Sequence, residues 1–232
     1  MPLWVFGLWI LLYLSLLTFS VIQLSASFFL PVFYNGDTTS KLIALTFDDG
    51  PNKDVTPKVL NLLEKYNINA TFFCIGSRIA GNEALVQRIH QNGHIIGNHS
   101  YSHANTFDFF STSKVKLELE KTEQLILSIT GKQMQLFRPP FGITNPNIAK
   151  VVSLSDYKTI GWSIRTFDAV SDNKKRILKK VNDQLQNGSV ILLHDVNEYV
   201  LDILEEIILL AQSRGYGFVT IDKMFSIKAY KN

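Results

Sequence analysis

Residues 41–51 have the sequence KLIALTFDDGP, in which apolar and β-branched side chains run up to two adjacent carboxylates, a glycine and a proline. The apolar run predicts a short buried strand over 41–47, and Asp, Gly and Pro are residues that turns favour. Thr56 followed by Pro57 then predicts a capped helix that continues to about residue 66. This stretch therefore predicts a strand and a helix, with acidic side chains at the carboxyl end of the strand.

The same alternation continues to the end of the chain. It predicts a parallel sheet with helices outside, which is an α/β fold built either as a doubly wound open sheet or as a closed barrel. Both architectures gather functional groups beyond the carboxyl ends of the strands. The expected strands are 41–47, 70–75, 94–97, 135–137, 157–164, 189–193 and 217–221, and the expected helices are 56–66, 82–92, 113–130, 145–154, 173–186 and 199–213.

The N-terminal segment has a different composition, because the first charged side chain in the sequence is Asp37. A helix needs roughly 20 apolar residues to cross a bilayer, and the stretch from 3 to about 24 supplies them. We expect residues 1–34 to form a single membrane anchor, 35–40 a linker and 41–232 a globular domain. A cleaved secretory signal ending near 25–27 is the alternative, but the long apolar run without Lys or Arg before it favours the anchor.

The overall composition excludes several classes of protein. A hydrophobic content of 46% excludes a disordered chain, and the single Cys74 excludes a disulfide scaffold. The formal net charge of +3 is too small to define a surface that follows nucleic-acid phosphates. We therefore expect one globular domain, a monomer, that does not bind nucleic acid.

Polar side chains follow several of the predicted strands. Two imidazoles and one carboxylate are a suitable ligand set for Zn²⁺ in an open catalytic site. His99 and His103 lie four residues apart, so that one helical turn would bring both rings to the same side. The alternative is a pair of surface histidines, but three of the five histidines follow strands beside acids. The residues at strand ends are Asp48 and Asp49, His99 and His103, Arg138, Asp168, and His194 with Asp195.

Four motifs then resemble a known family. LTFDDGP, HSYSH, FRPPFG and LLHD occur in this order and resemble the signature motifs of the NodB-like polysaccharide deacetylases, carbohydrate esterase family four. The resemblance extends over residues 41–220. It implies a distorted (β/α)7 barrel and metal-dependent hydrolysis of N-acetyl or O-acetyl groups on sugars.

The resemblance also implies roles for individual residues. Asp48 is expected to be the catalytic base and His194 the general acid. Arg138 is expected to hold Asp48, and Asp168 to pair with His194. The remaining expected roles are those of Asp49, His99 and His103 as metal ligands, of the Phe141 backbone N–H as oxyanion donor, and of Leu192 in lining a pocket for the acetyl methyl group.

The sequence thus predicts a metal-dependent hydrolase that removes N-acetyl groups from a glycan such as chitin oligomers, peptidoglycan or poly-N-acetylglucosamine. Zn²⁺ is the expected ion, with Co²⁺ or Ni²⁺ as alternatives. An O-acetyl xylan esterase, a non-sugar amide hydrolase and a non-catalytic glycan-binding protein remain open. Arg165 stands where the family commonly has an acid and Ala169 where it usually has Trp, which predicts a more open groove. The expected substrates place the domain outside the cytoplasm, tethered to the membrane.

Overall fold

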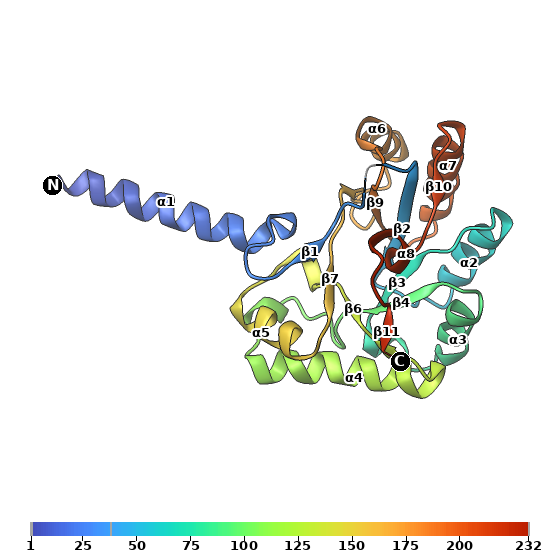
Figure 1. Ribbon diagram of the computed structural model, residues 1–232, viewed down its shortest axis with the longest axis horizontal. Coiled ribbons are helices and arrows are strands. Elements are labelled where there is room, and N and C mark those ends of the chain that lie inside the picture. Colours follow the sequence, from blue (N-terminus) through green and yellow to red (C-terminus); the bar gives the residue numbers. More distant parts are fainter. Residues whose placement is uncertain (1, 38, 232) are drawn as a thin grey trace.

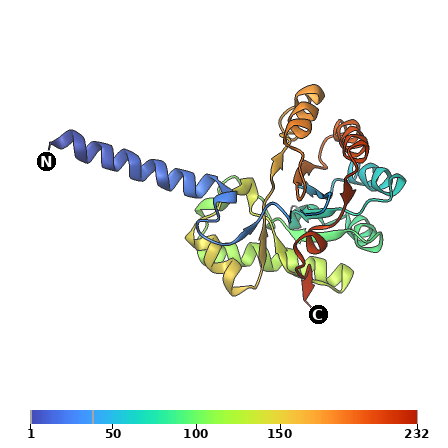
Figure 2. The ribbon, with the colours of Figure 1, turned by 45° about the horizontal axis from the view of Figure 1, so that its top comes forward.

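The computed structural model describes residues 2–37 and 39–231, and its centre is a curled parallel sheet with helices around it (Figures 1 and 2). The sheet begins at β1 and ends at β8, and within the described residues no ladder joins these two edges. The barrel is therefore distorted and open, which confirms the predicted fold. The strand order is β1 (Val32–Phe33), β7 (Lys158–Ile160), β6 (Leu136–Phe137), β4 (Ile95–Asn98), β3 (Thr71–Cys74), β2 (Leu42–Asp48), β9 (Val190–His194) and β8 (Ile164–Arg165), with β10 (Gly217–Phe218) also paired to β2.

The helices cover the outside of the sheet and match the predicted ones within about two residues at each end. Asn145 and Asn173 stand at predicted helix starts and cap their helices, since each side chain accepts a hydrogen bond from a backbone N–H. The predicted cap Thr56 is instead the first residue inside its helix, and Val55 precedes it without a side-chain cap. The longer helices are α2 (Thr56–Lys65), α3 (Glu83–Gln91), α4 (Thr112–Thr130), α5 (Pro146–Leu154), α6 (Lys174–Gln184) and α7 (Val200–Ser213). The shorter elements are η1 (Leu24–Ala26), η2 (Gly76–Arg78), η3 (Phe107–Phe109), η4 (Pro140–Gly142), α8 (Ile221–Phe225) and an antiparallel pair of β5 (Gln133–Met134) with β11 (Tyr230–Lys231).

Two strand predictions were wrong. The predicted strand 157–164 is two strands, β7 and β8, because the carbonyls of Ile160 and Gly161 turn to accept hydrogen bonds from a buried arginine. The predicted strand 217–221 ends at Phe218, and α8 follows. The break after β7 therefore provides two carbonyl acceptors for a buried guanidinium.

The strands alternate between two apolar layers. On β2, Ile43, Leu45 and Phe47 pack in the larger core cluster that includes buried residues of the outer helices. Ala44 belongs to a second, smaller cluster. Because side chains alternate along a strand, Thr46 and Asp48 share the face of Ala44. The inner face of β2 therefore changes from apolar to acidic toward its carboxyl end.

The N-terminal helix α1 (Leu3–Ile22) projects away from the domain (Figure 1). Its stretch Trp4–Ile22 is long and apolar enough to cross a membrane. Only 6% of this apolar stretch is buried against the rest of the protein. The chain then returns to the domain, since Leu24 and Leu30 are buried and β1 pairs with β7. Part of the predicted anchor range therefore packs on the sheet. The domain limits 1–34, 35–40 and 41–232 stay a prediction, and Met1, Thr38 and Asn232 lie outside the described residues.

The packing between the two central strands predicts where the fold is sensitive. Phe47 and Phe72 stack with their ring centroids 4.9 Å apart, and both are buried. We expect Phe72→Ala to lower the free energy of unfolding by about 3–5 kcal/mol, because it leaves a cavity in the core. Chemical denaturation of the full chain in detergent, followed by circular dichroism, measures this. Phe109→Ala is the control, since that ring is exposed and its loss should change stability by only about 0.5 kcal/mol. Equal losses in the two variants would contradict this description of the core.

Candidate active site and metal centre

A buried ion pair positions the first carboxylate. Asp48 ends β2, and its Oδ1 accepts a hydrogen bond from Nη1 of Arg138 at 2.7 Å. Arg138 is completely buried and also donates to the hydroxyl of Thr46 and to the carbonyls of Ile160 and Gly161. Burial lowers the pKa of the guanidinium, and the charge of Asp48 opposes this. The geometry thus matches the predicted holding role of Arg138, and it leaves Oδ2 of Asp48 free of that bond.

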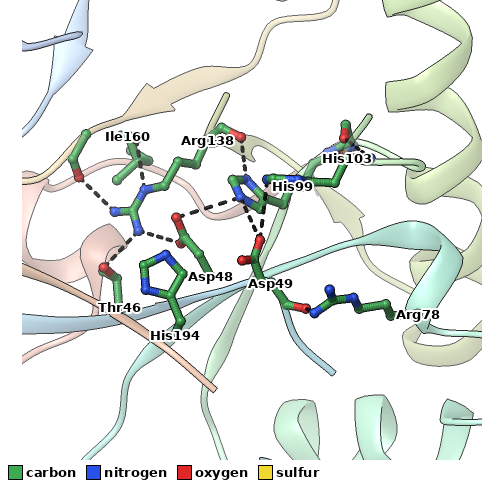
Figure 3. A network of polar contacts seen from close by, with 12 residues as sticks. Thr46, Asp48, Asp49, Arg78, His99, His103, Arg138, Ile160 and His194 are labelled. Atoms are coloured by element: carbon green, nitrogen blue, oxygen red, sulfur yellow. Dashed lines mark hydrogen bonds and ion pairs between the residues drawn. The ribbon is translucent and has the colours of Figure 1, made fainter. Parts of the chain in front are cut away.

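A second group lies beside this pair. One ligand atom each from Asp49, His99 and His103 lies within 4.8 Å of the other two (Figure 3). Asp49 Oδ1 is 3.5 Å from His99 Nε2 and 3.4 Å from His103 Nε2. The three residues predicted to be ligands are therefore brought together, whereas their role as ligands stays a prediction.

The two histidines reach this position through a loop. A helical turn had been expected to align them, but residues 99–103 are not helical. Ser100 and His103 instead have φ of 63° and 47°, in the left-handed region that non-glycine residues seldom adopt. Asp49 and Phe141 share this conformation, with φ of 73° and 59°. Such conformations cost about 1–3 kcal/mol each and persist where the surrounding structure fixes them, often at functional sites.

The tautomer of His99 follows from its outer partner. Its Nδ1 lies 2.8 Å from the backbone carbonyl of Arg138, which can only accept, so Nδ1 carries the proton. Nε2 is the nitrogen that faces Asp49. Partners of this kind orient the histidine ligands of metal sites.

The chemistry of this cluster fits a divalent cation. Asp49 Oδ1 is buried and has no hydrogen-bond partner in the described residues, although it lies 3.5 Å from Nε2 of His99. Burial lowers the pKa of His103 to about 4, and the charge of His99 adds to this, so that His103 is neutral at neutral pH. Burial by itself raises the pKa of Asp49, but the nearby imidazoles more than offset this and hold it below its usual range. Two imidazoles around an unpartnered carboxylate oxygen are a donor set that Zn²⁺ and related ions accept.

The third group is a histidine paired with an acid. His194 ends β9 and lies in register with Asp48 on β2. Its Nδ1 is 2.9 Å from Asp168 Oδ1, and its backbone N–H donates to Asp168 Oδ2. Burial lowers the pKa of His194, but Asp168 and the neighbouring carboxylates outweigh this and raise it overall. The predicted pairing of these two residues is present in the structure.

The remaining predicted residues border this centre. The ring of Phe141 lies 4.8 Å from that of His103, so its backbone is close to the proposed ligands. Leu192 is buried on the face of β9 that also carries His194. Asp195 does not cap the following helix, because α7 begins only at Val200. Its buried carboxylate instead accepts from the hydroxyl of Thr56, and burial raises its pKa to about 6.

Sequence reasoning missed several supporting groups. Thr46 could have been found, because it precedes Asp48 by two residues and so shares its face of the strand. The carbonyls of Ile160 and Gly161 carry no signal in the sequence, since every residue has one. Arg78, which donates to the backbone carbonyl of Asp49, reaches the site from η2 and had no motif to mark it.

Comparison with known proteins places this site in a family. A family profile described as polysaccharide deacetylase matches residues 35–160. The chain is also 34% identical over 196 residues to the peptidoglycan-N-acetylmuramic acid deacetylase PdaA of Bacillus subtilis, a match that covers 83% of this chain and 74% of PdaA. The chain belongs to the polysaccharide deacetylase family. Its sequence resemblance to that family is thereby confirmed.

Further similarities come from one longer relative and one solved structure. The chain is 37% identical over 190 residues to the peptidoglycan-N-acetylglucosamine deacetylase PgdA of Listeria monocytogenes. That match covers 82% of this chain but only 40% of the length of PgdA. The crystal structure of the Bc1960 peptidoglycan N-acetylglucosamine deacetylase superposes with a TM-score of 0.80 at 32% identity. That match covers 86% of this chain and 95% of the other.

The site geometry predicts how the chain binds a metal. We expect the full chain to take up one Co²⁺, measured by titration calorimetry and by the visible absorption of the ion. His99→Gln should weaken binding by more than about 100-fold, since loss of an outer partner alone typically costs about 10- to 100-fold. His90→Gln, the same substitution on α3, should bind as the native chain does. Equal affinity in both variants would contradict the predicted site.

Proposed function

We propose that this protein is a metal-dependent deacetylase of N-acetylated glycans, with peptidoglycan as the substrate class that the names of its relatives favour. One observation carries the proposal. The carboxylate of Asp48, held by Arg138, lies between the Asp49, His99 and His103 cluster and the ring of His194 (Figure 3). His194 is in turn paired with Asp168. A base, a metal site and an acid therefore share one strand-end surface.

Asp48 is the proposed base. Because Arg138 occupies Oδ1, the other oxygen is available, and Oδ2 lies 3.8 Å from Nε2 of His99 on the side of the metal cluster. A water molecule there can give its proton to Oδ2 as it attacks the acetyl carbon. The ion pair keeps Asp48 in the orientation that this proton transfer requires.

Asp49, His99 and His103 would hold the ion, which we propose to be Zn²⁺. When bound, such an ion acidifies a water and stabilises negative charge that develops on the carbonyl oxygen. The backbone N–H of Phe141 would share that charge, and removal of one such donor typically costs about 2.7–4 kcal/mol of barrier. Leu192 would receive the acetyl methyl group.

His194 is the proposed acid. A sugar amine leaves readily only when it is protonated, so the acid must carry its proton at the pH of the reaction. Asp168 favours the imidazolium and fixes the ring through Nδ1. The proton on Nε2 can then pass to the leaving nitrogen. Base and acid therefore have different partners, which keeps their proton affinities apart.

We further propose that α1 is a membrane anchor and that the catalytic domain lies outside the cytoplasm. The support is the length of the apolar helix, its exposed side chains and the extracellular location of peptidoglycan. A cleaved signal is the alternative. Immunoblotting of membrane fractions distinguishes them, because a chain cleaved near residues 25–27 would lose the apolar helix and appear in the medium.

The role of Asp48 yields a direct prediction. We expect the zinc-loaded chain to release acetate from N-acetylglucosamine oligomers or peptidoglycan, and Asp48→Asn to lower kcat by about 10²- to 10⁴-fold, because the base is lost. Asp54→Asn is the matched control, since Asp54 is an exposed acid in the loop that follows the same strand. Glycan binding by both native chain and Asp48→Asn, with no turnover by either, would instead favour a non-catalytic glycan-binding protein. Release only from acetylated xylan would favour the esterase alternative.

The pair of His194 with Asp168 predicts a pH dependence. His194 acts while protonated, so activity should fall as the pH rises through its pKa, which Asp168 raises. Asp168→Asn removes the anionic partner, and the alkaline limb of the kcat profile should therefore move to lower pH. Asp172→Asn, an exposed acid in the same loop, should leave the profile in place. An active Asp168→Asn variant with an unmoved alkaline limb would exclude His194 as the acid.

A further inference from the structure

The apolar N-terminal helix meets the domain at the rim of the catalytic face. Near the end of α1, the carbonyl of Val21 accepts a hydrogen bond from the backbone N–H of Thr144 at 3.3 Å, and Ser20 is buried. Thr144 follows η4, the short element after β6 that carries Phe141. The helix therefore leaves the molecule beside a loop that borders the proposed active site.

The other loops of this rim expose large apolar side chains. Phe109 is 83% exposed and Val170 is 81% exposed, and Phe141 and Phe167 are also exposed. These residues belong to the loops that follow β4, β6 and β8, which leave the sheet at its carboxyl ends. Exposed apolar side chains in neighbouring loops at one end of a sheet indicate a surface that contacts a partner or a membrane.

A cavity of about 430 Å³ separates the end of α1 from this rim. Ile22 and Gln23 line it on the helix side, and Tyr34 and Trp162 form part of its wall. Arg165 and Lys180 line it from β8 and α6. Trp162 also lies over Arg138, with the guanidinium 5.6 Å from the ring centroid, so one tryptophan borders both the cavity and the catalytic centre.

The two cations of this cavity have aromatic neighbours and no acidic partner. Arg165 stacks on Trp162 and Phe167 at 5.4 and 5.0 Å, and Lys180 lies 4.3 Å from the centroid of Phe167. Within the part of the chain that the structure describes, neither forms an ion pair with a carboxylate, unlike Lys174 and Lys179 on the same helix. Burial and the charges of Arg165 and Arg176 lower the pKa of Lys180, as expected where positive charge is not neutralised. The cavity is therefore suited to an anion.

The position of the cavity favours a lipid headgroup over an acidic glycan as the source of that anion. Ile22 is the last residue of α1, so if α1 crosses the bilayer the cavity lies at the depth of the lipid headgroups. Trp and Tyr are the aromatic residues that favour this depth, and cations beside a membrane helix attract anionic headgroups. An acidic glycan could bind through Arg165 and Lys180 alone. It would not explain why the end of α1 lines the same cavity.

We propose that the cavity lined by Arg165 and Lys180 binds the phosphate of an anionic membrane lipid, and so holds the mouth of the catalytic site against the membrane surface. This inference rests on the anchoring role proposed for α1. It assigns a binding function to the arginine that replaces the acid common at this position. It also gives the exposed side chains of Phe109, Phe167 and Val170 a common environment at the membrane surface.

Fluorescence of Trp162 in the full chain tests the proposal. The chain has three tryptophans, so Trp4→Phe with Trp9→Phe leaves Trp162 as the only one. We expect its emission to change, in phosphatidylcholine nanodiscs, as the fraction of phosphatidylglycerol increases. Arg165→Gln with Lys180→Gln should require roughly thirtyfold more phosphatidylglycerol, because each cation near an anionic surface contributes about 1 kcal/mol. Inorganic phosphate added to pure phosphatidylcholine discs should not reproduce the change.

The matched control is Lys175→Gln with Lys179→Gln, which removes the same charge from the same helix outside the cavity. It should shift the response no more than about threefold. A native chain without a response, or an equal shift in both double variants, would overturn the proposal. So would a response to a soluble acidic peptidoglycan fragment but not to phosphatidylglycerol. Acetate release from a glycan by the protein in the same nanodiscs is measured separately. Failure of lipid binding is thereby distinguished from failure of the deacetylase activity.

Discussion

The burial of Arg138 is the constraint on which the rest of the site depends. A guanidinium with no access to water must have its donors satisfied within the protein, and one anion must balance its charge. Asp48 supplies the anion, Thr46 a hydroxyl, and Ile160 and Gly161 their carbonyls. Loss of one partner from such a buried pair typically costs about 3–5 kcal/mol, so these groups constrain one another. The same requirement accompanies the break between β7 and β8, where these two carbonyls turn toward the guanidinium.

The parallel sheet then places the other functional groups relative to this pair. Asp48 and His194 are register partners on neighbouring strands, so the proposed base and the proposed acid lie side by side at one end of the sheet. Their environments differ, because Asp48 contacts a guanidinium while His194 contacts a carboxylate. The contact with Asp168 raises the pKa of His194, and the two groups are proposed to serve opposite proton transfers. Asp49, one residue further, turns to the imidazoles through its left-handed backbone.

Much of this arrangement could be predicted from the sequence, since it depends on periodic patterns. Amphipathic spacing and the Asn145 and Asn173 caps located the helices, and strand-end positions brought the acids and histidines together. The missed features depend on contacts between distant segments. β1 is the clearest case, because Val32 and Phe33 continue an apolar run and nothing local shows that they pair with β7. The same reasoning explains why the helical turn expected at residues 99–103 was wrong. The spacing of His99 and His103 fits a helical turn, but a loop with left-handed residues brings the two rings together instead.

The central claim is that Asp49, His99 and His103 hold one ion while Asp48 stays free to act as a base. Anomalous diffraction from crystals grown with Zn²⁺, recorded on both sides of the zinc absorption edge, tests it most directly. We predict a single peak about 2.0–2.2 Å from one oxygen of Asp49 and from Nε2 of both histidines, with Asp48 hydrogen-bonded to Arg138 and outside ligand distance. A peak at any other cluster, or a zinc ion that takes Asp48 as a ligand in place of Asp49, would contradict it.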